Sequence, residues 1–330
     1  MVTDNAESRN PPSGEGGYDD SCVRQNAVHQ NMITTDHMPT PTSRPADTLF
    51  DHIVIVGVGL IGGSIARALK DRGLAHQITG LGRNRERLLA AQAAGLLDAV
   101  ATSVAELDPF SLAIVCTPVD RIPDDVRALQ AVAPAHALIT DAGSVKARLC
   151  RELGSLRPGQ ATFLGSHPMA GSEQGGWEHS SAHLFEGRIC AITPTGHEEP
   201  IVQAIERFWS ALGMGTIRLH PEQHDRIVAL TSHLPHATAA AVASLLTPDA
   251  WPLAATGFRD TTRVASGDPA LWTSILIENR EAVAEHLREL IGILNQFATA
   301  LDSGHPGEIA TLLAKGKAAR DQWLHSRTTN

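Results

Sequence analysis

The sequence predicts an α/β protein in which a mostly parallel sheet, covered by helices, is followed by an all-helical part. Short apolar runs alternate with helical patterns from about residue 48 to residue 220, which is typical of a doubly wound sheet. After His220 the strand signals stop and Ala- and Leu-rich helical patterns follow. A glycine-rich turn joins the first strand to the first helix. We therefore expect a tail at residues 1–48, a first domain at 49–220 and a second at 221–330.

The tail is rich in Asp, Asn, Ser, Thr, Pro and Gly and has no periodic apolar pattern. Such a segment buries too little apolar surface to offset its ordering entropy, so we expect it to be disordered. It also lacks the basic start and apolar core of a secretion signal. Met32 and Met38 are alternative translation starts that the sequence does not separate.

The glycine-rich turn is the strongest single motif. The β-branched run at residues 53–56 leads into Gly57, Gly59 and Gly62, and apolar residues then recur at helical spacing as far as Gly73. In a Rossmann-type domain the first glycine allows the tight turn, the second lets the backbone approach a pyrophosphate, and the third lets helix and strand pack closely. The alternative is a turn that needs glycine for its geometry alone. The strand and helix on either side favour dinucleotide binding.

The remaining elements follow from the same patterns. Further strands are expected at 77–81, 112–116, 137–140, 162–164, 189–193 and 216–219, and helices at 85–94, 201–212, 225–246, 269–301 and 306–324. Pro235 should kink or break the helix that contains it. Ligands of such sheets bind beyond the carboxyl ends of the strands, so the chemistry is expected in the turns that follow them.

Composition excludes several classes of partner. The 330 residues carry a formal net charge of −9, so no basic surface for nucleic acid is expected, and no apolar run reaches membrane-spanning length. The four cysteines are far apart in the sequence and include no Cys-x-x-Cys pair. This usage indicates reduced thiols in a cytoplasmic protein and gives no zinc site.

The end of the second predicted strand bears on the choice of cofactor. An NAD enzyme of this type usually has an acidic residue there to bind the ribose 2′-hydroxyl, but this chain has Gly82 followed by Arg83. An arginine binds phosphate oxygens, so the pair favours NADP over NAD. The alternative is that Arg83, Arg85 and Arg87 form the solvated start of a helix.

Polar clusters follow the predicted strands and recur in the helical part. They are D-A-G-S-V-K at 141–146, G-S-H-P-M-A-G-S-E at 165–173, S-H-L-P-H at 232–236 and G-F-R-D-T-T-R at 257–263. His167, at the binding edge of the sheet, can accept a substrate proton near neutral pH. His233 and His236 lack further ligands at a recognisable spacing, so we expect no metal. The absence of a G-x-S-x-G elbow argues against hydrolase chemistry.

These motifs, in the order GVGLIGGS, CTPV, DAGSVK, GSHPMAGSE, SHLPH and GFRDTTRVASGDPALW, resemble the prephenate/arogenate dehydrogenase family from about residue 50 to 325. The resemblance implies oxidative decarboxylation in tyrosine biosynthesis: prephenate gives 4-hydroxyphenylpyruvate, or arogenate gives tyrosine, as a nicotinamide is reduced. It also implies a nicotinamide-binding domain followed by a helical dimerisation domain, and hence a homodimer. No additional regulatory domain is expected after Leu324.

The resemblance also implies roles for individual residues. His167 would be the base for the C4 hydroxyl, Ser144 would bridge that hydroxyl and the nicotinamide, and Arg263 would pair with a substrate carboxylate. Arg259 and Lys146 are further candidate cations. The expected pocket-lining or gating residues are His236, Ser232, Trp272, Ser172 and Glu173. The expected cofactor-binding residues are Gly57, Gly59, Leu60, Ile61, Gly62, Arg83, Thr117 and Ser144.

Three alternatives stay open at this point. The sequence does not separate prephenate from arogenate, which differ in bearing a keto acid or an amino acid side chain. Another two-domain hydroxyacid or imine dehydrogenase would share the glycine turn without requiring His167 and Arg263. A non-catalytic dimer that only binds NADP would require a broken site, yet Ser144, His167, His236 and Arg263 are all present.

Overall fold

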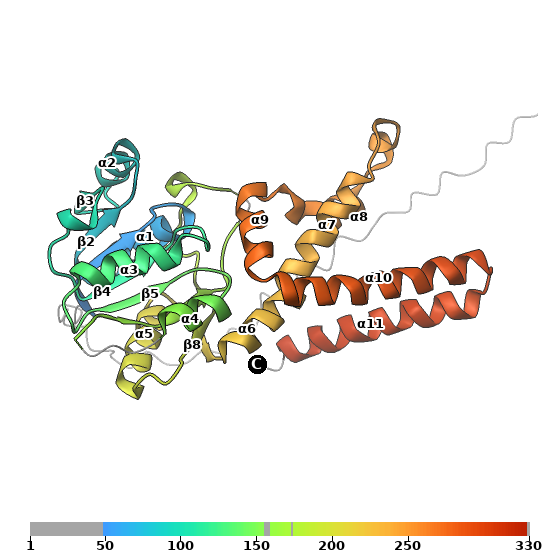
Figure 1. Cartoon of the computed structure of the whole chain (residues 1–330). Coiled ribbons are helices and arrows are strands. Elements are labelled where there is room, and N and C mark those ends of the chain that lie inside the picture. Colours follow the sequence, from blue (N-terminus) through green and yellow to red (C-terminus); the bar gives the residue numbers. More distant parts are fainter. Residues whose placement is uncertain (1–48, 155–158, 173, 329–330) are drawn as a thin grey trace, which may run out of the picture. The chain divides into compact units, whose positions relative to one another are not determined.

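The computed structural model describes residues 49–154, 159–172 and 174–328, so the predicted tail lies outside the described residues (Figure 1). Six parallel strands form the first sheet in the order β3-β2-β1-β4-β5-β6. They are β1 Phe50–Val56, β2 Ala75–Leu81, β3 Ala99–Ala101, β4 Leu112–Val115, β5 Leu138–Asp141 and β6 Thr162–Phe163. The strand order reverses between β1 and β4, where doubly wound sheets bind their ligands.

Four helices connect these strands: α1 Leu60–Arg72, α2 Arg85–Ala93, α3 Ile122–Val132 and α4 Ala147–Leu153. The structure confirms the predicted first strands and the helices at the glycine turn and at 85–94. A strand that is buried on both faces has a continuous run of apolar residues, and such runs made β1 and β4 predictable from the sequence.

The strands predicted at 189–193 and 216–219 are present within one residue of those bounds, but they belong to a separate sheet. Strands β7 Gly165–Pro168, β8 Ile189–Thr193 and β9 Gly215–Arg218 lie in the order β7-β8-β9, with β7 antiparallel to β8 and β8 parallel to β9. The segment around His167, expected to be a loop, is strand β7. The chain changes sheet at Leu164, directly after the two-residue strand β6. Helix α5, Glu199–Ala211, follows β8.

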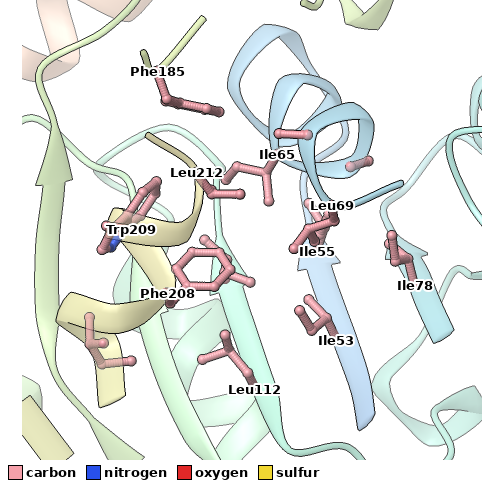
Figure 2. Close-up of a cluster of buried hydrophobic side chains, with 14 of the residues drawn as sticks. Ile53, Ile55, Ile65, Leu69, Ile78, Leu112, Phe185, Phe208, Trp209 and Leu212 are labelled. Atoms are coloured by element: carbon pink, nitrogen blue, oxygen red, sulfur yellow. The ribbon is translucent and has the colours of Figure 1, made fainter. Parts of the chain in front are cut away.

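A hydrophobic core joins both sheets and their helices. Figure 2 shows Ile53 and Ile55 of β1 next to side chains of α1, with Phe208 and Trp209 of α5 in the same cluster. The intervening residues of β1, such as Val54, enter a second core with α3 on the opposite face. This alternation is expected of a strand covered on both faces.

The helical part contains α6 Pro221–Val228, α7 Leu234–Ser244, α8 Thr256–Thr262, α9 Pro269–Glu278, α10 Arg280–Asp302 and α11 Pro306–Thr328. The helix predicted at 225–246 is instead two helices, α6 and α7, joined by the π-helical turn Ala229–His233. Pro235 lies just inside α7, so the predicted interruption is present there. The 3-10 segments in this part are Pro248–Leu253 and Arg263–Ser266. None of the described helices combines the length and apolarity needed to cross a bilayer.

The single helix predicted at 269–301 is also wrong, since the chain breaks at Asn279 into α9 and α10. Asn279 is 6% exposed, and its side-chain amide donates to the carbonyl of Asp225 and contacts His233 Nδ1 at 3.1 Å. These tertiary hydrogen bonds fix a residue whose φ and ψ of −113° and 26° are not helical. The apolar pattern alone could not reveal them.

The turn between β5 and α4 is built around a buried ion pair. Lys146, a candidate cation for the substrate in the sequence, has a fully buried side chain that pairs with the carboxylate of Asp141. Asp141 also accepts hydrogen bonds from the backbone N–H groups of Gly143 and Ser166, at 2.9 and 3.1 Å. The pair therefore joins the end of β5 to the start of β7.

We expect Lys146→Ala to lower the free energy of unfolding by about 3–5 kcal/mol, because it leaves the buried Asp141 carboxylate without its cation. Lys70→Ala is the matched control: its pair with Asp98 is about one-third exposed on each side chain, and its loss should cost about 0–1 kcal/mol. Urea unfolding followed by tryptophan fluorescence measures both. Equal effects of the two substitutions would contradict the structural role of the buried pair.

Candidate active site

The glycine turn after β1 has the geometry that a dinucleotide requires. Gly57 has a φ of 86°, which favours glycine. A Cβ at Gly62 would clash with the carbonyl oxygen of Gly57, so this glycine serves close packing of helix and strand. Gly59, by contrast, has no atom within 4 Å of a Cβ placed on it, so its backbone is open to a ligand. Leu60 and Ile61 begin α1, whose first turn has no side-chain cap and no acidic residue, so its N–H groups can bind an anion.

The other expected cofactor residues lie at the carboxyl edge of the same sheet. Thr117 follows β4 and borders Gly57, and its hydroxyl donates to Asp125 at 2.6 Å. Arg83 lies two residues beyond β2 and is exposed. Next to it, Asn84 caps α2 by accepting from the Arg87 N–H. The residues present thus fit a dinucleotide along the edge formed by β1, β2 and β4.

His167 lies on β7 and is 8% exposed. Its Nδ1 is 2.9 Å from Nε2 of His224, which belongs to α6 in the helical part. Burial lowers the pKa of His167 well below its usual range, and the nearby groups His224, Lys146 and His233 lower it further. His167 is therefore neutral at physiological pH and able to accept a proton.

A continuous series of contacts leads from His167 into the helical part. His224 Nδ1 is 2.8 Å from Oδ1 of Asp225, and Asn279 contacts both Asp225 and His233. The rings of His233 and His236 both pack against Trp272 of α9. The His236 ring is stacked on Trp272 with centroids 3.5 Å apart, and burial lowers its pKa. We call this series, from His167 to His236 and Trp272, the histidine cluster.

Polar atoms without a partner mark where a ligand would be recognised. Ser144 Oγ, His233 Nε2 and His236 Nδ1 are buried, and none has a hydrogen-bond partner among the described residues. Ser144 lies two residues before Lys146, whose N–H donates to Asp225 at 2.8 Å, so its loop is tied to the histidine cluster. Buried polar groups are normally hydrogen-bonded, so these three are candidates for contact with substrate or cofactor.

The structure brings together only part of the predicted substrate site. His167, His236 and Trp272 lie in the histidine cluster, and Ser232 is half-buried in the π-helical turn next to His233. Arg263 is exposed at the start of the segment Arg263–Ser266, which packs against α7, the helix that carries His236.

Two of the other predicted residues are exposed, and one lies outside the described residues. Ser172 is exposed, and Glu173 lies outside the described residues. Arg259, the other candidate cation, is exposed beside Asp260.

Three residues of the site, His224, Asp225 and Asn279, were not found by sequence reasoning. The only signal is the adjacent His-Asp pair at the start of a helix, and its partner His167 is 57 residues away. Among the described residues, no group of three or more His, Cys, Asp or Glu side chains is placed to hold a metal ion.

An open glycine turn on a parallel sheet, with a buried histidine on β7, which packs against β5 of that sheet, points to a dehydrogenase that uses a nicotinamide dinucleotide. Comparison with known proteins narrows the class. Residues 65–217 match the family described as prephenate dehydrogenase, nucleotide-binding domain, and residues 220–315 match prephenate dehydrogenase, dimerization domain. The chain belongs to the prephenate dehydrogenase family.

Individual relatives agree with this assignment. Prephenate dehydrogenase of Bacillus subtilis is 32% identical over 283 residues, which are 82% of this chain and 76% of that protein. Cyclohexadienyl dehydrogenase of Zymomonas mobilis is 32% identical over 78% of this chain and 90% of its own. The crystal structure of A. aeolicus prephenate dehydrogenase with hydroxyphenyl propionate and NAD+ has a TM-score of 0.76 at 31% identity, covering 82% of this chain and 98% of that one.

We expect Gly59→Ala to fold normally and to bind the dinucleotide at least about tenfold more weakly, a loss of about 1.4 kcal/mol. The added methyl group meets no protein atom but occupies the space through which a pyrophosphate approaches the backbone. Titration calorimetry with NAD+ and NADP+ measures the affinity, and thermal unfolding measures the fold. Gly62→Ala is the contrasting variant, because its methyl group clashes inside the protein and should lower Tm. Unchanged affinity in Gly59→Ala would place the pyrophosphate elsewhere.

Proposed function

We propose that the protein oxidatively decarboxylates prephenate to 4-hydroxyphenylpyruvate with NAD(P)+ as the hydride acceptor. The observation that carries this proposal is His167: a buried, neutral imidazole with one nitrogen hydrogen-bonded inside the protein, next to unpartnered polar atoms in a chain of this family. Such an imidazole has its other nitrogen available for a substrate hydroxyl. The names of the relatives support prephenate as the substrate.

The residues would act as follows. Nε2 of His167 would accept the proton of the C4 hydroxyl, and a nicotinamide dinucleotide held at the glycine turn would supply the acceptor for the C4 hydrogen, which leaves as hydride. The resulting ring ketone loses the ring carboxylate as CO2 because the electrons of that bond complete the aromatic ring. The proton held by His167 then returns to the ring oxygen, so the phenol forms without net proton release. A base of this kind typically contributes about 10²–10⁴-fold to the rate.

The pocket residues would recognise the two carboxylates and the hydroxyl of the substrate. Ser144 Oγ would contact both the hydroxyl and the nicotinamide, and Arg263 would pair with a carboxylate, assisted by Arg259 if a second cation is needed. His236, Ser232, Trp272, Ser172 and Glu173 would line or gate the pocket. Lys146 is not proposed for this role, because its charge is used by Asp141 inside the protein.

Arogenate is the second candidate substrate. It shares the ring that reacts with His167 and differs only in its side chain, so the contacts of the histidine cluster serve it equally. The similarity of the chain to a cyclohexadienyl dehydrogenase supports arogenate as this second candidate.

We further propose NADP+ as the preferred cofactor, since Arg83 stands exposed where an NAD enzyme usually has a carboxylate. A homodimer through the helical part is proposed from the dimerization-domain match and from exposed apolar side chains on α10 and α11. Among them are Ile291, Leu294, Leu301, Leu313 and Trp323. A cytoplasmic location is proposed from the cysteine usage, and Cys116, Cys150 and Cys190 are free thiols whose pKa burial raises.

The decisive experiment combines each substrate, prephenate and arogenate, with each cofactor, NAD+ and NADP+, and follows nicotinamide absorbance. We expect turnover of prephenate, and a loss of about 10²–10⁴-fold in kcat for His167→Asn with unchanged cofactor affinity. His220→Asn is the control, because this histidine is exposed and pairs with Glu222. Absence of turnover with either substrate in the wild-type protein would refute the proposed function.

The cofactor preference is tested separately with Arg83→Ala. We expect KM for NADP+ to rise by about tenfold or more and KM for NAD+ to change little, because only the former carries a 2′-phosphate. Arg85→Ala is the matched control, since Arg85 lies two residues after Arg83, at the start of α2, but pairs with Glu106. Equal effects of Arg83→Ala on both cofactors would rule out the phosphate contact.

A further inference from the structure

We infer that His224 and Asp225 are positioning residues that fix the protonation pattern of His167, so that its Nε2 always presents a lone pair to the substrate. This inference deepens the proposed function and rests on it. The three side chains form one hydrogen-bonded series, His167 Nδ1 to His224 Nε2 at 2.9 Å and His224 Nδ1 to Asp225 Oδ1 at 2.8 Å. His224 and Asp225 are 1% and 5% exposed, so bulk water does not compete for these bonds.

Both carboxylate oxygens of Asp225 are held by hydrogen-bond donors. Its Oδ1 accepts the backbone N–H of Lys146 and its Oδ2 accepts that of Ala147, both at 2.8 Å, at the N-terminal end of α4. Asn279 donates to the backbone carbonyl of Asp225 and so fixes the residue from the helical side. A carboxylate surrounded by N–H donors at the positive end of a helix is stabilised in its charged form.

The direction of each hydrogen bond follows from this anchor. A carboxylate only accepts, so Nδ1 of His224 carries the hydrogen and donates to Asp225. Nε2 of the neutral His224 ring is then an acceptor, which requires that His167 donates through Nδ1–H. Nε2 of His167 is left unprotonated, which is the state a base needs. If Nε2 of His224 carried a proton, His167 would have to accept through Nδ1 and would present Nε2–H to the substrate.

The same series stabilises the protonated product of the base step. When His167 takes the substrate proton, its Nδ1–H still donates to His224, whose ring is polarised by Asp225. Positive charge on the groups that face His167 opposes this step, and His224, Lys146 and His233 each lower its pKa. A His224 ring that donates through Nδ1 and accepts through Nε2 carries no such charge. Lys146 is compensated by Asp141, and burial lowers the pKa of His233 to about 4, so His233 is neutral. The negative charge that favours a protonated His167 is therefore that of Asp225, which acts on His167 through the hydrogen-bonded ring of His224.

The inference is tested at His224, because a substitution at Asp225 would also uncap α4. His224→Phe keeps a buried ring but removes the acceptor for His167 Nδ1–H. His224→Gln restores an acceptor, since the amide oxygen can occupy the place of Nε2. Gln223→Ala, an exposed neighbour on α6, is the matched control. The measurements are kcat and KM with prephenate across pH, and Tm.

We expect His224→Phe to lower kcat by about 10–10³-fold, with KM values changed less than about threefold. The acid limb of the pH profile, where the His167–His224 pair binds a proton, should move to lower pH by about one unit, because the imidazolium has lost its acceptor. His224→Gln should recover most of kcat. A purely structural role predicts instead a lower Tm, raised KM values and an unmoved acid limb, with no recovery in His224→Gln, and this result would overturn the inference.

A readout without substrate separates this inference from the proposed function. Nitrogen-15 NMR of histidine-labelled protein, with the His167 signals assigned by their loss in His167→Asn, should show hydrogen on Nδ1 and none on Nε2 in the wild-type protein. His224→Phe should shift this pattern toward hydrogen on Nε2. Hydrogen on Nε2 in the wild-type protein would overturn the inference even if prephenate is turned over. The expected NMR pattern without turnover would refute only the proposed function.

Discussion

The ion pair between Asp141 and Lys146 is the interaction on which the geometry of the site depends. One oxygen of Asp141 accepts the N–H of Ser166, directly before His167, and the other accepts the N–H of Gly143, directly before Ser144. A single carboxylate therefore places both candidate site residues. Burying it is costly in free energy, and Lys146 with the two backbone donors offsets that cost. The hydroxyl of Ser166 also holds the end of β5 next to β7, because it donates to the backbone carbonyl of Asp141 and accepts from the indole N–H of Trp209.

A second carboxylate, Asp225, ties the helical part to the loop after β5, just as Asp141 ties the start of β7 to that loop. It comes from α6 but binds the first N–H groups of α4, which follows the sheet strand β5. The helical part thereby contributes His224 to a site whose His167 belongs to β7. Both carboxylates act on one five-residue stretch, Gly143 to Ala147, which explains why the loop after β5 is central to the site. Asp225 therefore both holds the loop after β5 in place and accepts the hydrogen bond from His224.

Much of the fold was accessible from the sequence, because buried parallel strands and a glycine turn leave local signals. The run at Ile53 and the spacing of Gly57, Gly59 and Gly62 predict their structure from neighbours alone. The split into two sheets was not accessible, since nothing near Gly165 shows which strand it pairs with. Likewise the burial of Lys146 and the break at Asn279 depend on partners far along the chain. Motif resemblance singled out His167, Ser144, His236 and Arg263 as candidates, whereas His224 and Asp225 could be recognised only in three dimensions.

The π-helical turn Ala229–His233 has a consequence for how the chain can change. Such a turn contains one residue more than the α-helix it interrupts, and each residue of an α-helix advances about 100° around the axis. The bulge takes up this extra residue locally, so the side chains before and after it keep the relative orientation of an uninterrupted helix, and His236 stays on the face that stacks on Trp272. A further residue inserted there, with no second bulge to absorb it, would turn α7 by about 100° relative to α6 and carry His236 away from Trp272 while His224 kept its place.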